Sequence, residues 1–97
     1  MEVRFATREL AKICTSERWM QKELGSQRAK KLKLRLDDLL AAEQMSDLLL
    51  MGGKWELLKA DRAGQWSARL TGNWRLIVQE ESSQPPTVSV VEIVDYH

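Results

Sequence analysis

Residues 65–80, QWSARLTGNWRLIVQE, decide the fold, because apolar and polar side chains alternate on both sides of a tight-turn signal at Thr71-Gly72. A period of two residues is that of a β-strand, whose side chains point alternately to its two faces. The stretch therefore predicts two strands, 65–70 and 73–80, joined by that turn. The apolar faces are Trp66, Ala68 and Leu70 in the first strand, and Trp74, Leu76 and Val78 in the second.

The first half of the chain has the period of a helix instead. Thr7 can cap a helix that ends at Gly25, with a possible interruption near Ser16. Ser26 can cap the strongest helix, over residues 26–44. Its apolar face consists of Ala29, Leu32, Leu36, Leu39 and Leu40, which recur at helical spacing.

The rest of the chain supplies shorter elements. We expect strands at 1–5, 54–59 and 87–94, an extra helical turn at 46–51 and a polar loop at 81–86. Helices followed by strands with short turns indicate the α+β class, with two N-terminal helices packed on a curved antiparallel β-sheet. At 97 residues the chain is expected to form a single domain, 1–97.

Composition excludes several classes of protein. No apolar stretch approaches the ~20 residues of a membrane span, and no signal peptide is visible. Cys14 is the one cysteine, so no internal disulfide can form, and a reduced, cytoplasmic protein without membrane contact is the simplest interpretation. One cysteine and one histidine also make a transition-metal site unexpected.

Charge is distributed unevenly along the chain. Residues 1–36 contain ten Lys/Arg and four Glu, and residues 37–97 contain five Lys/Arg and ten acidic residues. The first third is thus near +6 and the remainder near −5. Such polarity suggests an anionic partner for one face, although a solvated helix surface is the more ordinary explanation of a charge run.

Few side chains could perform chemistry, since the motifs of serine hydrolases, phosphate-binding loops and zinc proteases are missing. Arg75 lies mid-strand between apolar residues, so its guanidinium either pairs with a buried carboxylate or faces a cleft. Tyr96 and His97, the one tyrosine and the one histidine, end the chain, where they either fray or move protons. Cations beside such a pair suit phosphate chemistry. The full candidate set is Glu56, Lys59, Arg62, Arg69, Arg75, Asp95, Tyr96 and His97.

The stretches RAGQWSARLTGNWRLIVQ and VEIVDYH resemble the toxins of the HigB group, the killer-protein branch of the RelE/ParE toxin superfamily. The family pattern is matched at Lys59–Trp66, at Gly72–Leu76 and at the terminal Asp95–His97. The segments LAKICTSE and AKKLKLRLDDLLAAE also resemble that group, so the resemblance covers nearly the whole chain.

This resemblance implies a toxin of a type II toxin–antitoxin system. Such toxins enter the ribosomal A site and cut mRNA there, without a metal or cofactor. The 2′-OH attacks the adjacent phosphate and leaves a 2′,3′-cyclic phosphate and a free 5′-OH. The implied partners are the ribosome, mRNA and a HigA-like helix-turn-helix antitoxin, through which the pair contacts operator DNA.

The resemblance also implies roles for individual residues. Lys59 would contact the phosphate or assist deprotonation, and Arg75 would stabilise the phosphorane. Tyr96 and His97 would transfer protons and orient the nucleotide, with Asp95 positioning them. Our hypothesis is that His97 protonates the leaving 5′-oxygen.

One position departs from the family pattern. Some members carry a histidine three residues before the lysine, where this chain has Glu56. Glu56 is either the general base or a bystander, and strict strand alternation would place it on the face opposite Lys59. The general base could therefore be Glu56, Lys59 or Tyr96.

Other side chains are assigned to binding or packing. We expect the basic residues to contact ribosomal RNA or an acidic antitoxin, since such patches bind polyanions by counterion release. We expect the four tryptophans to pack rather than stack on bases, and Cys14 to be a small buried apolar residue. Two other functions stay open: a ParE-like poison of DNA gyrase, and an inactive toxin-like module. The expected RNA or ribosome contacts are Lys30, Lys31, Lys33, Arg35, Arg62 and Arg69.

Overall fold

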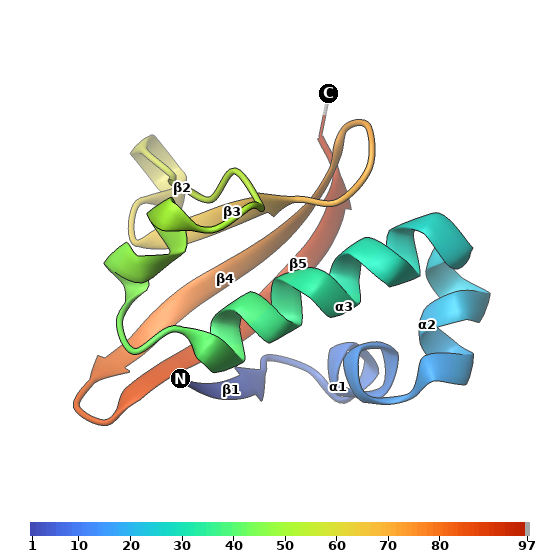
Figure 1. The fold of residues 1–97 in the computed structure, drawn as a ribbon, viewed down its shortest axis with the longest axis horizontal. Helices are drawn as coiled ribbons and strands as arrows, with labels where there is room; N and C mark the ends of the chain where they lie inside the picture. Colours follow the sequence, from blue (N-terminus) through green and yellow to red (C-terminus); the bar gives the residue numbers. More distant parts are fainter. Residues whose placement is uncertain (97) are drawn as a thin grey trace.

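The computed structural model describes residues 1–96 and has two layers, with helices covering one face of a five-stranded sheet (Figure 1). The predicted α+β class is confirmed. The helices are α1 (Arg8–Thr15), α2 (Glu17–Leu24) and α3 (Ser26–Ala41), and the 3₁₀ helices are η1 (Met45–Leu50) and η2 (Ala60–Arg62). The strands are β1 (Glu2–Phe5), β2 (Glu56–Leu57), β3 (Gln65–Arg69), β4 (Trp74–Ser83) and β5 (Pro86–Asp95).

The sheet has the strand order β1-β5-β4-β3-β2, and each neighbouring pair is antiparallel except β1 with β5. The antiparallel sheet expected from the sequence is therefore mixed at one edge. A hairpin turn fixes the direction of its two strands. β1 and β5 come from opposite ends of the chain, so no such turn constrains them.

Side chains that accept backbone hydrogen bonds set the helix boundaries. The hydroxyl of Thr7 accepts from Leu10 N at 3.0 Å, and that of Ser16 accepts from Trp19 N at 3.4 Å. The second cap divides the predicted helix into α1 and α2 at the expected position. The cap of α3 is Gly25 rather than Ser26, because φ at this residue is 81°, a left-handed conformation that glycine adopts without steric cost.

α3 ends at Ala41, three residues before the predicted end at residue 44, and the amino terminus of the chain caps it there. The ammonium of Met1 donates to three carbonyl oxygens, those of Leu39 at 2.9 Å, Leu40 at 3.1 Å and Ala42 at 2.8 Å. A cation is stabilising at a helix carboxyl end, where carbonyl groups lack partners within the helix. This contact joins the start of β1 to the end of α3.

The core lies between α3 and the sheet. Leu32 and Leu39 of α3 are fully buried against a cluster that includes Leu76, Val78 and Val90. Leu40 is a correction to the predicted helix face, since it is 62% exposed. Its position on α3 is at the outer margin of the apolar stripe.

Two strand boundaries also differ from the prediction. The strand expected at 54–59 contracts to β2, because Lys54 and Ala60 have φ values of 50° and 58°, which turn the chain away from an extended conformation. The loop expected at 81–86 contracts to Gln84 and Pro85, since β4 and β5 continue to pair as far as Ser83 and Pro86. None of the helices in residues 1–96 combines the length and apolar character needed to cross a bilayer.

Candidate active site

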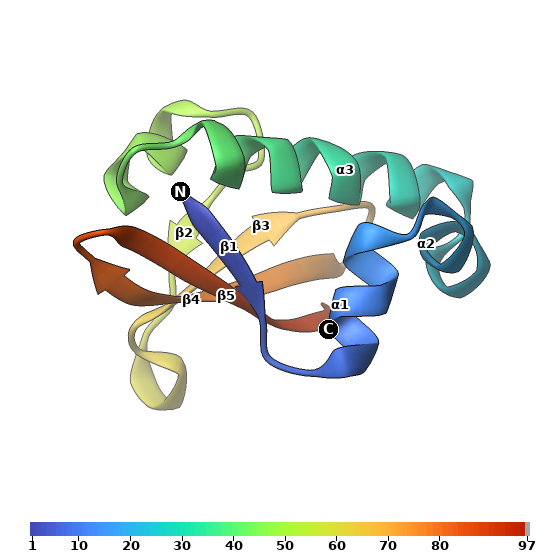
Figure 2. The ribbon, with the colours of Figure 1, turned by 90° about the horizontal axis from the view of Figure 1, so that it is seen from below.

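The sheet face turned away from α3 carries most of the predicted site residues. Figure 2 shows α3 on one side of the sheet and the loop after β2 projecting from the other. We call this second side the outer face. The strand register places Glu56, Ser67, Ile77 and Glu92 in one row across it, and Arg69, Arg75 and Val94 in the next.

The floor of the outer face is closed to water. Ser67 is 2% exposed and Ile77 is fully buried, although Ile77 lies outside the main core cluster. The charged residues of the two rows therefore surround a covered floor. A charge beside such a floor is less screened than one in open solvent, so it acts more strongly on a bound anion.

Arg62 reaches the outer face from the loop after β2. Its Nη2 donates to Oε1 of Glu92 at 2.7 Å, and its Nη1 donates to Oε1 of Gln65 at 3.0 Å. The hydrogen bond with Glu92 is the main cause that raises the pKa of Arg62. The guanidinium carbon lies 6.0 Å from the centre of the Tyr96 ring. One arginine thus connects β3, β5 and Tyr96.

Arg75 is half-buried in the second row. Its Nη1 donates to the carbonyl oxygens of Gly72 at 2.9 Å and Trp74 at 3.0 Å. The ion pairs within residues 1–96 do not include Arg75. Of the two alternatives considered for it, pairing with a buried carboxylate is not found in that part of the chain. Its charge stays available to an anion on the outer face.

The backbone of Tyr96 is bound to the turn that precedes β4. The amide of Tyr96 donates to the carbonyl oxygen of Asn73 at 2.8 Å, in the turn that precedes β4. Tyr96 is 37% exposed. Asp95 pairs in register with Trp74, whose side chain packs against the core. The orienting role expected of Asp95 stays a prediction, and His97 lies outside the described residues.

Glu56 and Lys59 lie at the sheet edge formed by β2. Glu56 pairs with Ser67, so it shares the row that contains Glu92. Lys59 is exposed and precedes η2. Because β2 ends at Leu57 and the chain turns at Ala60, strand alternation does not fix the face on which Lys59 lies. Strand alternation therefore does not require Glu56 and Lys59 to lie on opposite faces, as the sequence alone suggested.

The basic residues of α3 divide into exposed and buried members. Lys30 and Lys31 are exposed. Lys33 is also exposed, and its ammonium lies 2.7 Å from Glu17, which lowers the pKa of that carboxyl by hydrogen bonding. Arg35 is a correction to the expected binding set, because it is only 8% exposed.

The burial of Arg35 follows from its contacts inside the fold. Its Nε lies 3.5 Å from Oδ2 of Asp38, one turn further along α3, and the same oxygen accepts from Nε1 of Trp55 at 3.1 Å. Gly53 covers the guanidinium, where a Cβ would overlap it. Arg35 therefore has a structural role.

The tryptophans pack as predicted. Trp55 is buried, and Trp66 and Trp74 lie partly buried against the core. The guanidinium of Arg28 lies 4.6 Å from the centre of the Trp74 ring. Trp19 is partly buried and has the ammonium groups of Lys12 and Lys22 at 4.5 and 4.6 Å from its ring centre.

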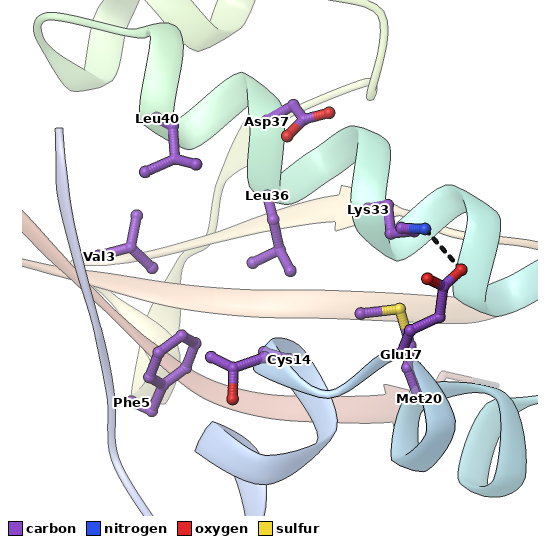
Figure 3. Close-up of a pocket in the computed structure, with 10 residues that line it drawn as sticks. Val3, Phe5, Cys14, Glu17, Met20, Lys33, Leu36, Asp37 and Leu40 are labelled. Atoms are coloured by element: carbon purple, nitrogen blue, oxygen red, sulfur yellow. Dashed lines mark hydrogen bonds and ion pairs between the residues drawn. The ribbon is translucent and has the colours of Figure 1, made fainter.

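A groove of about 470 Å³ lies on the helical layer, between α3, β1 and the first two helices (Figure 3). Val3, Phe5 and Leu36 line it, with the Lys33–Glu17 ion pair among the lining residues. Cys14 borders the groove and is buried as predicted, which raises the pKa of its thiol to about 12. The groove thus offers apolar surface rather than a reactive group.

Sequence reasoning missed Glu92 and Gln65 as members of the outer face. Glu92 could have been found from the sequence, because it is a carboxylate within the otherwise apolar run VVEIV. A charged residue in such a strand is expected to have a partner. Residues 1–96 contain no group of three or more His, Cys, Asp or Glu side chains that could hold a metal ion.

Comparisons with known proteins identify the family and the fold. A family model described as "RelE-like toxin of type II toxin-antitoxin system HigB" matches residues 4–97. No curated protein sequence matches the chain significantly.

Among solved structures, the YoeB/ParE toxin from Agrobacterium tumefaciens superimposes with a TM-score of 0.69 at 20% identity, over 100% of both chains. The YoeB dimer from Staphylococcus aureus has a TM-score of 0.64 and the YoeB–YefM complex of that organism 0.63. Each of these is 19% identical over 100% of this chain and 97% of the other. At such identities the structures show a shared fold.

Proposed function

Because the chain belongs to the HigB-like family, the RelE-like toxins of type II toxin–antitoxin systems, we propose that it is a ribosome-dependent endoribonuclease that cuts mRNA. One observation carries the proposal: the outer face carries two cations, Arg69 and Arg75, opposite each other on β3 and β4. On the same face, Arg62 lies beside the phenol of Tyr96 and the carboxylate of Glu92. These are the groups that phosphodiester cleavage by an internal hydroxyl requires.

The reaction proceeds by attack of the 2′-oxygen on the adjacent phosphorus. The O2′–P bond forms, the P–O5′ bond breaks, and the products are a 2′,3′-cyclic phosphate and a 5′-hydroxyl. The O2′ proton passes to a base and another proton reaches O5′. The reaction is thus balanced in atoms and charge without a metal or cofactor. Proton transfer by a positioned side chain contributes about 10²–10⁴-fold.

The residues divide these tasks as follows. Arg75 stabilises the extra negative charge of the phosphorane, with Arg69 opposite it on β3. Tyr96 and His97 transfer protons, and His97 protonates O5′. Glu56 is a candidate base because it shares the outer face with Arg75, and Lys59 contacts the phosphate or assists.

As a type II toxin, the protein pairs with an antitoxin, as in the YoeB–YefM complex. We propose a HigA-like helix-turn-helix antitoxin as that partner, with operator DNA bound through it. We also propose that Lys30, Lys31 and Lys33 contact the ribosome, since they lie along the solvent side of α3. Arg35 is no longer part of this set.

Primer extension on defined mRNA bound to purified ribosomes tests the proposal. We expect cleavage within the codon in the A site when the chain is present, and none when ribosomes are omitted. Cleavage of the naked mRNA at the same sites would contradict ribosome dependence. Gyrase-linked DNA breaks without mRNA cleavage would support the ParE-like alternative, and neither effect would support an inactive module.

A further inference from the structure

Glu92 places a carboxylate on a face that is proposed to bind RNA. It lies opposite Ile77 and two residues before Val94, which is the partner of Arg75 on β4. Its side chain is 38% exposed. A free carboxylate in this place would repel a phosphate, so its presence needs a reason of its own.

The contacts of Glu92 supply that reason. The carboxylate accepts from Nη2 of Arg62 at 2.7 Å, while Gln65 accepts from Nη1 at 3.0 Å. Two acceptors on different strands therefore hold the two ends of one planar guanidinium. Without them, a long side chain on a three-residue turn would keep its rotamer freedom.

The guanidinium held in this way lies 6.0 Å from the ring centre of Tyr96. This is at the limit of about 6 Å at which a cation is attracted to an aromatic face. The backbone of Tyr96 is attached to the fold by the hydrogen bond that its N–H donates to the carbonyl oxygen of Asn73. Among residues 1–96, Arg62 is thus the charged group that lies against the ring itself.

We propose that Glu92 is a positioning residue, which fixes Arg62 against Tyr96 and so orients the phenol for proton transfer. The catalytic part of this inference rests on the proposed function. Pairing with Glu92 also neutralises much of the charge of Arg62, which leaves Lys59, Arg69 and Arg75 as the cations for phosphate. Arg62, expected from the sequence to bind RNA, acts on the tyrosine instead.

The single tyrosine makes a direct test possible. Incorporating 3-fluorotyrosine into the full chain gives one ¹⁹F resonance, from position 96. We expect Glu92→Gln to shift and narrow this resonance, because the ring gains freedom when Arg62 is released. Glu80→Gln, on the exposed part of β4, is the matched control and leaves the resonance unchanged. Thermal unfolding verifies that each variant is folded.

Arg62→Lys is the second variant, which keeps the charge but loses the planar guanidinium that donates to both Glu92 and Gln65. It must shift the resonance as Glu92→Gln does, and it decides the question if Glu92→Gln fails to fold. An unchanged resonance in the folded variants overturns the proposal. This arm does not depend on cleavage, so it tests the role of Glu92 even if the parent chain cuts no mRNA.

The kinetic arm separates positioning from charge screening. In single-turnover cleavage on programmed ribosomes, we expect Glu92→Gln to lower the maximal rate by about tenfold with little change in the half-saturating concentration of ribosomes. Tighter ribosome binding with an unchanged maximal rate contradicts the proposal, because it would mean that Glu92 only screens Arg62. Absence of cleavage by the parent chain would instead refute the proposed function.

Discussion

Arg69 and Arg75 are cross-strand partners on the outer face of the sheet. Like charges placed directly opposite each other on neighbouring strands are destabilising. An anion bound between them would remove that repulsion, as the phosphate of the proposed substrate would. This relationship gives the first prediction.

Arg75→Lys should lower the rate of mRNA cleavage by about 10²–10³-fold, since a planar guanidinium aimed at the phosphorane is replaced by a point charge. Arg4→Lys is the control, because Arg4 is exposed on β1 and pairs only with its neighbour Glu2 among the described residues. Single-turnover rates measure both. Equal rates for Arg75→Lys and the parent would remove Arg75 from the reaction.

Gly53→Ala should lower the free energy of unfolding by about 1–3 kcal/mol. The added methyl group would overlap the guanidinium of Arg35 and come within 2.9 Å of Nε1 of Trp55. The adjacent Gly52→Ala is the matched control, because its Cβ meets nothing within 4 Å. Urea unfolding of the two variants gives the comparison, and equal losses would indicate that Arg35 is not held under Gly53.

Burial of Cys14 should make stability depend on pH in the alkaline range. The pKa of the folded thiol is raised from 9.0 to about 12, so the folded state retains a proton that the unfolded state loses. This contribution is fully present below pH 9.0 and declines as pH rises towards 12.

Cys14→Ala removes this titrating group, so the difference in stability between parent and variant should shrink over that pH range. Chemical denaturation at a series of pH values measures it. A difference that stays constant from pH 8 to pH 11 would argue against a buried thiol.

The double variant Lys30→Gln and Lys31→Gln should weaken ribosome binding and make it less sensitive to salt. Each lysine that contacts a phosphate contributes about one unit to the slope of log affinity against log salt concentration. Lys54→Gln, beyond the end of α3, is the control. Binding measured at several salt concentrations decides, and an unchanged slope would place the ribosome contact elsewhere on the protein.

How far the sequence predicted the fold depended on how regular each pattern was. The alternation at 65–80 predicted β3 and most of β4, because period-two burial leaves a clear pattern. The start of α3 was less predictable, since Gly25 and Ser26 can both cap a helix, by different mechanisms. The left-handed conformations of Lys54 and Ala60, which shorten β2, leave no reliable signal in residues of those types.

The candidate site was predictable in composition rather than in pairing. Arg35 stood in a run of cations, and its burial depends on Asp38, Gly53 and Trp55 meeting in three dimensions. The same holds for Arg62, whose partner Glu92 is 30 residues away in sequence. Contacts of this range depend on strand order, which the sequence alone did not provide.

The chemistry of the cut ends tests the central claim most directly. mRNA cleaved on ribosomes by the purified chain should carry a 2′,3′-cyclic phosphate upstream and a 5′-hydroxyl downstream, as mass spectrometry of the fragments would show, and Arg75→Lys should suppress both products together. A 5′-phosphate on the downstream fragment, or undiminished cleavage by Arg75→Lys, would contradict attack by the 2′-hydroxyl on the outer face of this sheet.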